Sequence, residues 1–218
     1  MSQATLPTAG TTAPSGRHPV QGRSRDKKAR LLAAARTLIS AQGFETVRMA
    51  DIVAEAGCAI GTAYYLFGNK EGLFRALRED FIATMRANID GLDAVAAATE
   101  PLPLRLVVAK IVSQTLAQVR ANAGLLRANL ARSAAAPEEW SDFRDLVRLL
   151  QTRLADLLET RFTQAGIADP RLKIGFTLQV VFAMCANALL NDPGPLSLDD
   201  PAFETELIDV AQRYLERT

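Results

Sequence analysis

Apolar residues recur every three or four positions along most of this chain, a spacing that places them on one face of an α-helix. The clearest run contains Phe143, Leu146, Val147, Leu150 and Leu154. No segment shows the period-two alternation of a half-buried strand, and no Asn-Gly or Asp-Gly hairpin joins two β-branched runs. The sequence therefore predicts an all-α fold.

Turn-forming residues divide this pattern into about nine helices. The first is expected over about 26–42, because Gly43 stands where a left-handed C-cap would end it. Two shorter amphipathic runs follow on either side of Gly57, and Asn69 is placed to cap a longer fourth helix. Further helices are expected over about 138–165 and 170–190 and at the end of the chain.

Composition suggests three parts. Residues 1–24 are rich in Ala, Thr, Pro, Gly and Ser without an apolar period, so we expect a flexible basic arm. Residues 25–72 are expected to form a three-helix domain, and residues 73–218 a larger helical bundle.

Positive charge is concentrated near the N-terminus. Residues 1–80 carry 11 Lys and Arg against 7 Asp and Glu, whereas residues 81–218 carry 14 against 17. Such a segment suits a nucleic-acid backbone, because neutralising each phosphate releases condensed counterions. A solvated basic tail explains the charge equally well. Six basic groups lie within fourteen residues: Arg17, Arg23, Arg25, Lys27, Lys28 and Arg30.

Several features indicate a soluble, cytoplasmic protein. Cys58 and Cys185 are isolated thiols, which fits a reducing compartment. The most apolar stretch, 174–190, is interrupted by Gln179 and Asn187, so a membrane span is not expected. The N-terminus lacks the basic and apolar regions of a signal peptide.

Two short helices joined at Ala56-Gly57-Cys58-Ala59 and preceded by a longer one fit a helix-turn-helix. In that motif the second short helix enters the major groove of DNA. Small helical bundles also place Gly between short helices, so this spacing alone leaves both interpretations open.

Segment 43–74 carries a specific series of short motifs: Gly43-Phe44, Asp51-Ile52, Ala56-Gly57, Gly61-Thr62, Tyr64, Phe67, Lys70-Glu71 and Leu73-Phe74. It resembles the DNA-binding domain of the tetracycline-repressor (TetR) family of transcriptional regulators, and the resemblance covers about residues 26–75. It implies an N-terminal helix-turn-helix domain followed by a helical bundle that binds an effector and dimerises. Beyond residue 75 the chain resembles the family only in its helical character, its length and the turn before the last helix.

The resemblance, together with physical arguments, gives seven DNA-binding candidates. Thr62 and Tyr64 place hydroxyls near a helix N-terminus, which suits a phosphate. Gly61 lies inside a helix, where Gly costs roughly 0.5–1 kcal/mol relative to Ala, and close approach of DNA would explain it. A cation at the start of a helix is disfavoured by the dipole unless a phosphate binds there. The candidates are Arg48, Ala59, Gly61, Thr62, Tyr64, Tyr65 and Lys70.

Some residues depart from the family pattern or have a second interpretation. Ala59 stands where the family usually has a capping Ser or Thr, and Leu66 where His or Tyr is common, so the bases contacted are left open. One of the two tyrosines, Tyr64 or Tyr65, could be a packing residue. Cys58 is either a redox sensor near a helix N-terminus or a small apolar turn residue.

Helix 170–190 is apolar on nearly every face but contains two amides. Buried amides need partners, and an apolar cavity with one or two convergent polar groups is typical of small-molecule sites. We expect a pocket for an apolar or aromatic, uncharged effector. Alternatively, the amides bond across a dimer interface and no cavity exists. The pocket candidates are Trp140, Gln179, Phe182, Met184 and Asn187.

The main hypothesis is a homodimeric, ligand-responsive repressor that binds double-stranded operator DNA. Dimerisation is expected because one short recognition helix contacts too few base pairs for useful specificity. Helices 138–165 and 170–190 are the interface candidates. The rival hypothesis is a helical adaptor for a partner protein. An enzyme, metal site or cofactor is not expected, because the single histidine, His18, lies in the arm.

Overall fold

The computed structural model describes residues 18–133 and 137–216, and these contain helices and no strand. The predicted all-α fold is confirmed, with ten α-helices rather than about nine. They are α1 (His18–Gln42), α2 (Met49–Glu55), α3 (Ile60–Phe67), α4 (Lys70–Asp90), α5 (Leu92–Thr99), α6 (Leu104–Ala121), α7 (Ala123–Ser133), α8 (Ser141–Gln164), α9 (Pro170–Asn191) and α10 (Pro201–Glu216), with a short 3-10 helix, η1 (Pro137–Trp140), before α8.

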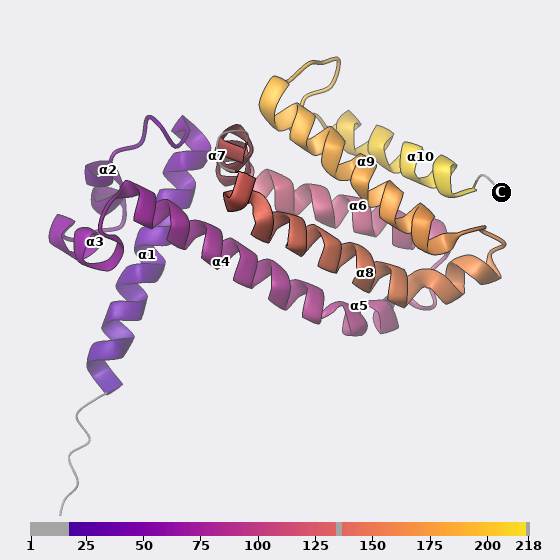
Figure 1. Cartoon of the computed structure of the whole chain (residues 1–218), viewed down its shortest axis with the longest axis horizontal. Helices are drawn as coiled ribbons and strands as arrows, with labels where there is room; N and C mark the ends of the chain where they lie inside the picture. The colour runs from indigo at the N-terminus through magenta and orange to yellow at the C-terminus, as the bar shows by residue number, and fades with distance from the viewer. Residues whose placement is uncertain (1–17, 134–136, 217–218) are drawn as a thin grey trace, which may run out of the picture.

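Helices α1, α2 and α3 pack together against the first turns of α4, at one end of the molecule (Figure 1). The apolar positions that predicted these helices are the ones they bury. Leu31 and Ala35 of α1, Ile52 of α2, Ala63 of α3 and Leu73 of α4 are all at most 1% exposed. Helices α2 and α3 are too short to be stable alone, so burial of these apolar side chains stabilises them.

The turn between α2 and α3 depends on its glycine. Gly57 has a φ of +59°, a left-handed conformation that residues with a Cβ adopt at a cost. The N–H of Gly57 donates to the carbonyl of Ala54 at 3.2 Å, and the N–H of Cys58 donates to that of Val53 at 2.9 Å. This turn sets the angle between α2 and α3.

The turn between α3 and α4 is equally constrained. The Oδ1 atom of Asn69 accepts from the N–H of Gly72 at 2.8 Å, so the predicted cap is confirmed. A Cβ on Gly72 would lie 1.9 Å from the carbonyl oxygen of Phe67. Only glycine therefore allows α4 to start this close to the end of α3.

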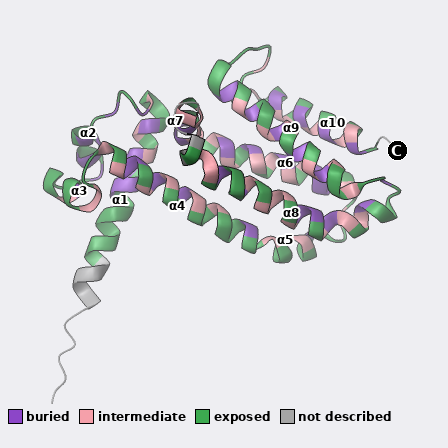
Figure 2. Cartoon of the chain, in the orientation of Figure 1, coloured by how far each residue is buried: buried purple, intermediate pink, exposed green. Residues whose placement is uncertain are grey.

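Helix α1 begins earlier than the sequence predicted. The expected start was near Asp26, but the helix starts at His18, so the 18–24 part of the predicted flexible arm is helical. Residues 1–17, with Arg17, lie outside the described residues. Residues 23–30 are exposed and project away from the other helices (Figure 2). They bury nothing, so no apolar period marks them, and the helix propagates outward from its packed part.

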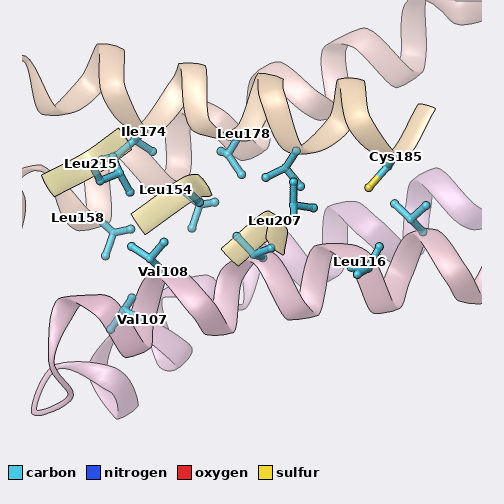
Figure 3. Packing of buried hydrophobic residues seen from close by; sticks show 14 of the residues in the cluster. Val107, Val108, Leu116, Leu154, Leu158, Ile174, Leu178, Cys185, Leu207 and Leu215 are labelled. Carbon is cyan, nitrogen blue, oxygen red and sulfur yellow. The ribbon is translucent and has the colours of Figure 1, made fainter. Parts of the chain in front are cut away.

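Helix α4 leads from the three-helix cluster into the bundle, where it lies beside α8 (Figure 1). Helix α8 also packs against α9, and α10 packs against both α6 and α9. The bundle core lies between α6, α8, α9 and α10 (Figure 3), where Leu116, Leu154, Leu178 and Leu207 are buried together. Burial of apolar side chains between these four helices stabilises the C-terminal part.

The N-terminal core extends into the bundle. It includes Leu125 of α7 and Phe143 and Leu146 of α8 in addition to residues of α1–α4. The rings of Phe81 and Phe143 stack with their centroids 5.5 Å apart. The predicted domain boundary between residues 72 and 73 lies inside the continuous helix α4. The two parts are thus joined by packing as well as by the chain.

Among the described residues, α9 is the one helix long and apolar enough to cross a membrane. Its inner face is nevertheless part of the bundle core, where Ile174, Leu178, Val181 and Cys185 are at most 5% exposed. The polar residues Gln179 and Asn187 lie on its outer side. This pattern is typical of a core helix of a globular protein.

Candidate functional site

Helix α3 presents a continuous outer face to solvent. Ala63 is fully buried, and Leu66 and Phe67 pack partly against the N-terminal core. The opposite side exposes Tyr64 at 50% and Tyr65 at 86%. Both tyrosines therefore face outward, and neither is a packing residue of the small core.

Gly61 lies on this outer face. A Cβ added at Gly61 would meet no atom within 4 Å. The protein itself gives no reason for a helix glycine at this position, because alanine would fit and favour the helix.

The remaining α3 candidates are also accessible. Ala59 is exposed at the N-cap of α3 and makes no side-chain cap bond. Thr62 is half-buried in the first turn, and its N–H donates to the carbonyl of Ala59 at 2.9 Å. Because the Ala59 side chain cannot accept a hydrogen bond, the first N–H groups of α3 have no side-chain acceptor. Such N–H groups suit a phosphate oxygen.

Two basic candidates flank this face. Arg48 is exposed at the N-cap of α2, where its N–H donates to the Asp51 carboxylate at 3.2 Å. Lys70 is half-buried, and its Nζ donates to the carbonyl of Glu45 at 3.0 Å and lies 4.5 Å from the ring centroid of Phe44. Lys70 thus ties the loop before α2 to the start of α4, in addition to any contact with a phosphate.

The projecting end of α1 carries a dense group of cations. Within exposed residues 23–30 there is one acid, Asp26. The positive charge therefore lies on a solvated helix at the same end of the molecule as α2 and α3 (Figure 1). Its basic residues are Arg23, Arg25, Lys27, Lys28 and Arg30.

A large cavity lies in the C-terminal part, with a volume of about 1120 Å³. Helices α4 to α9 all contribute to its walls. Most of the lining is apolar, with one wall formed by a row of side chains on α8: Leu146, Val147, Leu150, Leu154, Leu157 and Leu158. Its volume and apolar character are typical of a small-molecule site.

The structure corrects part of the predicted pocket. Trp140 and Phe182 line the cavity, but Gln179, Met184 and Asn187 are exposed on α9 and are not among the described residues of its wall. The Oδ1 atom of Asn187 instead accepts from Asn191 at 2.8 Å. The prediction assumed that the amides of α9 are buried, whereas the helix lies at the edge of the bundle and turns that side to solvent.

Sequence reasoning missed the polar part of the lining, which comes from α6. Lys110, Gln114 and Gln118 line the cavity, as does Asn88 near the end of α4. The signal was present as an i, i+4, i+8 row opposite the apolar row of α6. Such a row is ordinarily a solvated face, so its spacing alone does not assign it to a cavity.

The two thiols are free. Cys58 is half-buried, and its Sγ lies 3.5 Å from the carbonyl oxygen of Ala56. Burial raises the pKa of the Cys185 thiol to about 11, an effect that the nearby positive charge of Arg120 partly opposes. Cys185 is therefore a neutral core residue at physiological pH. The described residues contain no cluster of three or more His, Cys, Asp or Glu that could hold a metal ion.

An apolar surface lies on the outside of α9 and α10. Several large apolar side chains of α9 lie outside the bundle core and are exposed to solvent on this surface. The rings of Phe176 of α9 and Tyr214 of α10 contact each other, with their centroids 5.3 Å apart. Exposed apolar patches of this kind mark interaction surfaces. This α9–α10 face consists of Leu172, Phe176, Met184, Leu190 and Val210, exposed by 44–68%.

Several solved structures of other proteins are similar to this chain in fold. A protein from Mesorhizobium loti described as a TetR-family transcriptional regulator is 19% identical, with 89% of this chain and 95% of that chain covered at a TM-score of 0.66. The fatty acid degradation regulator FadR from Bacillus halodurans is 21% identical over 88% of this chain and 95% of that chain, with a TM-score of 0.61. FadR from Bacillus subtilis, solved in complex with stearoyl-CoA, is 20% identical over 84% and 96%, with a TM-score of 0.58.

Two family models match the sequence. Residues 31–77 match the bacterial regulatory proteins of the tetR family, and residues 103–215 match the tetracyclin repressor-like C-terminal domain. No curated protein is similar enough to count as a match. The two models cover most of the described chain, and the family consists of regulatory proteins rather than enzymes. The chain therefore belongs to the TetR family of DNA-binding transcriptional regulators.

Proposed function

We propose that this regulator is a homodimeric cytoplasmic repressor in which α3 of each protomer enters a major groove of operator DNA. The observation that carries this proposal is the outer face of α3, where Gly61, Tyr64 and Tyr65 are exposed and no internal contact explains them. Among the described residues, the two tyrosine hydroxyls make no hydrogen bond. Side-chain hydroxyls and free N–H groups at such a surface suit phosphate contacts that position the helix.

The α9–α10 face supports dimerisation. A protomer that exposes five large apolar side chains on two adjacent helices gains stability when a second copy covers them. The sequence predicts α8 and α9 as interface candidates, and the exposed apolar side chains of α9 support the α9 part of that prediction. Gln179 and Asn187 lie on the exposed side of α9, which fits the alternative that these amides contact the partner.

The large cavity supports control by a small molecule. Its walls are mostly apolar, and Trp140 and Phe182 offer aromatic surfaces to a ligand. The Bacillus subtilis FadR structure was solved in complex with stearoyl-CoA, which supports an effector with a long apolar chain. We infer that a largely apolar effector fills the cavity and releases the repressor from its operator.

Helix α7 is the element best placed to transmit occupancy of the cavity. Leu126 and Leu130 line the cavity, whereas Gly124 lies against the backbone of α1. Arg132 pairs with Glu71 at the start of α4 at 2.9 Å. A ligand that shifts α7 therefore shifts α1 and α4 and with them α3. To weaken operator binding by a few kcal/mol, the ligand must prefer the shifted state by roughly 100-fold.

Two substitutions on α3 test the proposed DNA contacts. Thr62→Ala and Tyr64→Ala should each weaken binding to a promoter fragment and to unrelated DNA by a similar factor, because both contacts are to phosphates. We expect about a fivefold loss for each, measured by fluorescence anisotropy. Thr84→Ala is the matched control, since Thr84 is exposed on α4 and donates to its own helix at Asp80.

Unchanged affinity of both α3 variants would reject the assignment of α3 to DNA. Lys70→Ala is a less direct test, because it also removes the bond to Glu45 and the contact with Phe44. We expect Lys70→Ala to lower the thermal unfolding temperature as well as the DNA affinity. The family assignment disfavours the rival adaptor hypothesis, under which α3 would not bind DNA and these variants would have no effect on DNA binding.

A further inference from the structure

The charged lining of the large cavity is of one sign, positive. Among the described residues that line it, Lys110 is the single charged one, and no Asp or Glu is present. Lys110 is exposed at the cavity edge, and no described residue forms a hydrogen bond or ion pair with it. Its positive charge is therefore uncompensated by the protein, and it faces a space that is otherwise mostly apolar.

Two amides extend this polar edge along α6. Lys110, Gln114 and Gln118 are spaced i, i+4 and i+8, so they form a row about 12 Å long on one side of the helix. Among the described residues, neither glutamine side chain has a hydrogen-bond partner. Thr115 is different, because its Oγ1 already donates to the carbonyl of Ile111 at 2.8 Å.

The wall across the cavity is apolar. Leu150, Leu154 and Leu157 of α8 line it, together with Val95 of α5. A ligand here meets the donors and acceptors of α6 on one side, and the remaining lining is mostly hydrocarbon, with Asn88 and Thr99 as polar exceptions. An uncharged apolar molecule would leave the strip unused, whereas an anion at Lys110 gains a charge-assisted hydrogen bond.

We propose that the effector is an amphipathic anion whose acidic group binds Lys110 and whose apolar body lies along α8. This inference rests on the proposed role of the cavity as the effector site, and it differs from the uncharged effector that the sequence suggested. The amides of Gln114 and Gln118 accept or donate to polar atoms next to the acidic group. A cavity of about 1120 Å³ has room for an extended body of this kind.

A series of ten-carbon probes that differ only in head group tests the charge preference. Decanoate, decan-1-ol and decyltrimethylammonium are titrated into the full-length protein by isothermal titration calorimetry. Trp140 lines the cavity and is the single tryptophan of the chain, so its fluorescence reports whether each probe enters. We expect decanoate to bind about tenfold more tightly than decan-1-ol, and the cation to bind most weakly.

Variants of Lys110 assign the preference to this residue. Lys110→Met should remove the difference between decanoate and decan-1-ol, and Lys110→Glu should reverse the order of decanoate and decyltrimethylammonium. Arg148→Met is the matched control, because Arg148 carries the same charge on α8, pairs with Asp145 and is 71% exposed. It should leave all three affinities unchanged.

The outcomes separate this inference from the proposed function. Equal affinity of the wild type for decanoate and decan-1-ol, with a change in Trp140 fluorescence, would overturn the anion preference and retain an apolar effector site. A preference for decanoate that survives in Lys110→Met would also overturn the assignment to Lys110. Failure of all three probes to bind would overturn both the inference and the effector role of the cavity, without bearing on DNA binding by α3.

Discussion

Substitution of Gly61 should affect the stability of the fold and the affinity for DNA in opposite directions. Its Cβ position is open, so Gly61→Ala should raise the free energy of unfolding by roughly 0.5–1 kcal/mol, the usual gain for alanine over glycine inside a helix. The added methyl group lies on the outer face of α3 and should lower affinity for promoter DNA by about tenfold. Urea denaturation and fluorescence anisotropy measure the two effects independently.

Gly175→Ala is the control for this substitution, because a Cβ at Gly175 in α9 also meets no atom within 4 Å. It should be neutral or slightly stabilising and leave DNA affinity unchanged. If Gly61→Ala stabilises the protein without weakening DNA binding, no external molecule approaches α3 closely at that position, and the interface lies elsewhere.

At the residue scale, the sequence predicted the exposed face of α3 better than the lining of the cavity. Gly61 and Tyr64 are three positions apart in one short helix, and this spacing places them on the same face. Gln179 and Asn187 were misplaced because local spacing does not reveal which side of an all-apolar helix faces the core. Lys110 was missed for the related reason that a polar row can face solvent or a cavity.

At the scale of elements, α7 links the cavity to the DNA-binding helices at a point of very close approach. A Cβ on Gly124 would lie 2.6 Å from the Cα of Ser40 and 2.7 Å from the carbonyl oxygen of Ile39. Gly124→Ala should therefore separate α7 from α1 and lower the free energy of unfolding by about 1–3 kcal/mol, the usual cost of overpacking. Urea denaturation, with Gly61→Ala as the glycine-to-alanine control, measures this cost.

The same substitution tests the proposed route of control. Because Gly124→Ala displaces α1 relative to the bundle, we expect a several-fold change in promoter affinity in the absence of any ligand. A folded Gly124→Ala variant with wild-type stability and wild-type DNA affinity would show that the α1–α7 contact is not part of the coupling.

Element boundaries were predictable where a packed face or a cap defines them. Gly43 ends α1 as predicted, with its N–H donating to the carbonyl of Ile39 at 2.9 Å, and Asn69 caps α4. The start of α1 and the separate helix α5 were not predicted. Residues 23–30 of α1 are exposed and bury no apolar side chain, and α5 is set apart from α4 only by the single residue Gly91.

At the scale of the whole molecule, the α9–α10 face predicts the oligomeric state. Phe176→Glu combined with Met184→Glu places two charges in the proposed dimer interface, where burying them is unfavourable. The variant should be monomeric by light scattering and bind promoter DNA at least about 100-fold more weakly than the wild type, because a monomer contacts one half-site.

Leu106→Glu is the control, since Leu106 is an equally exposed apolar residue, at 53%, on α6 rather than on α9 or α10. It should remain dimeric. A wild-type protein that is monomeric at micromolar concentration would contradict the dimer proposal directly.

The cavity itself could not be derived from the sequence, because six successive helices, α4 to α9, together form its walls. Each of these helices is recognisable from its period, but the space left between them depends on how all of them pack together. The family assignment, in contrast, followed from the short segment 43–74 and is confirmed by the family model over residues 31–77.

The most direct test of the account is an anisotropy titration with a fragment of the promoter of the protein's own gene and a scrambled fragment of the same composition. We expect the promoter fragment to bind at least about 100-fold more tightly, and both affinities to fall steeply as salt increases, because phosphate contacts release counterions. Equal affinity for the two fragments, or binding that does not depend on salt, would contradict sequence-specific recognition by α3.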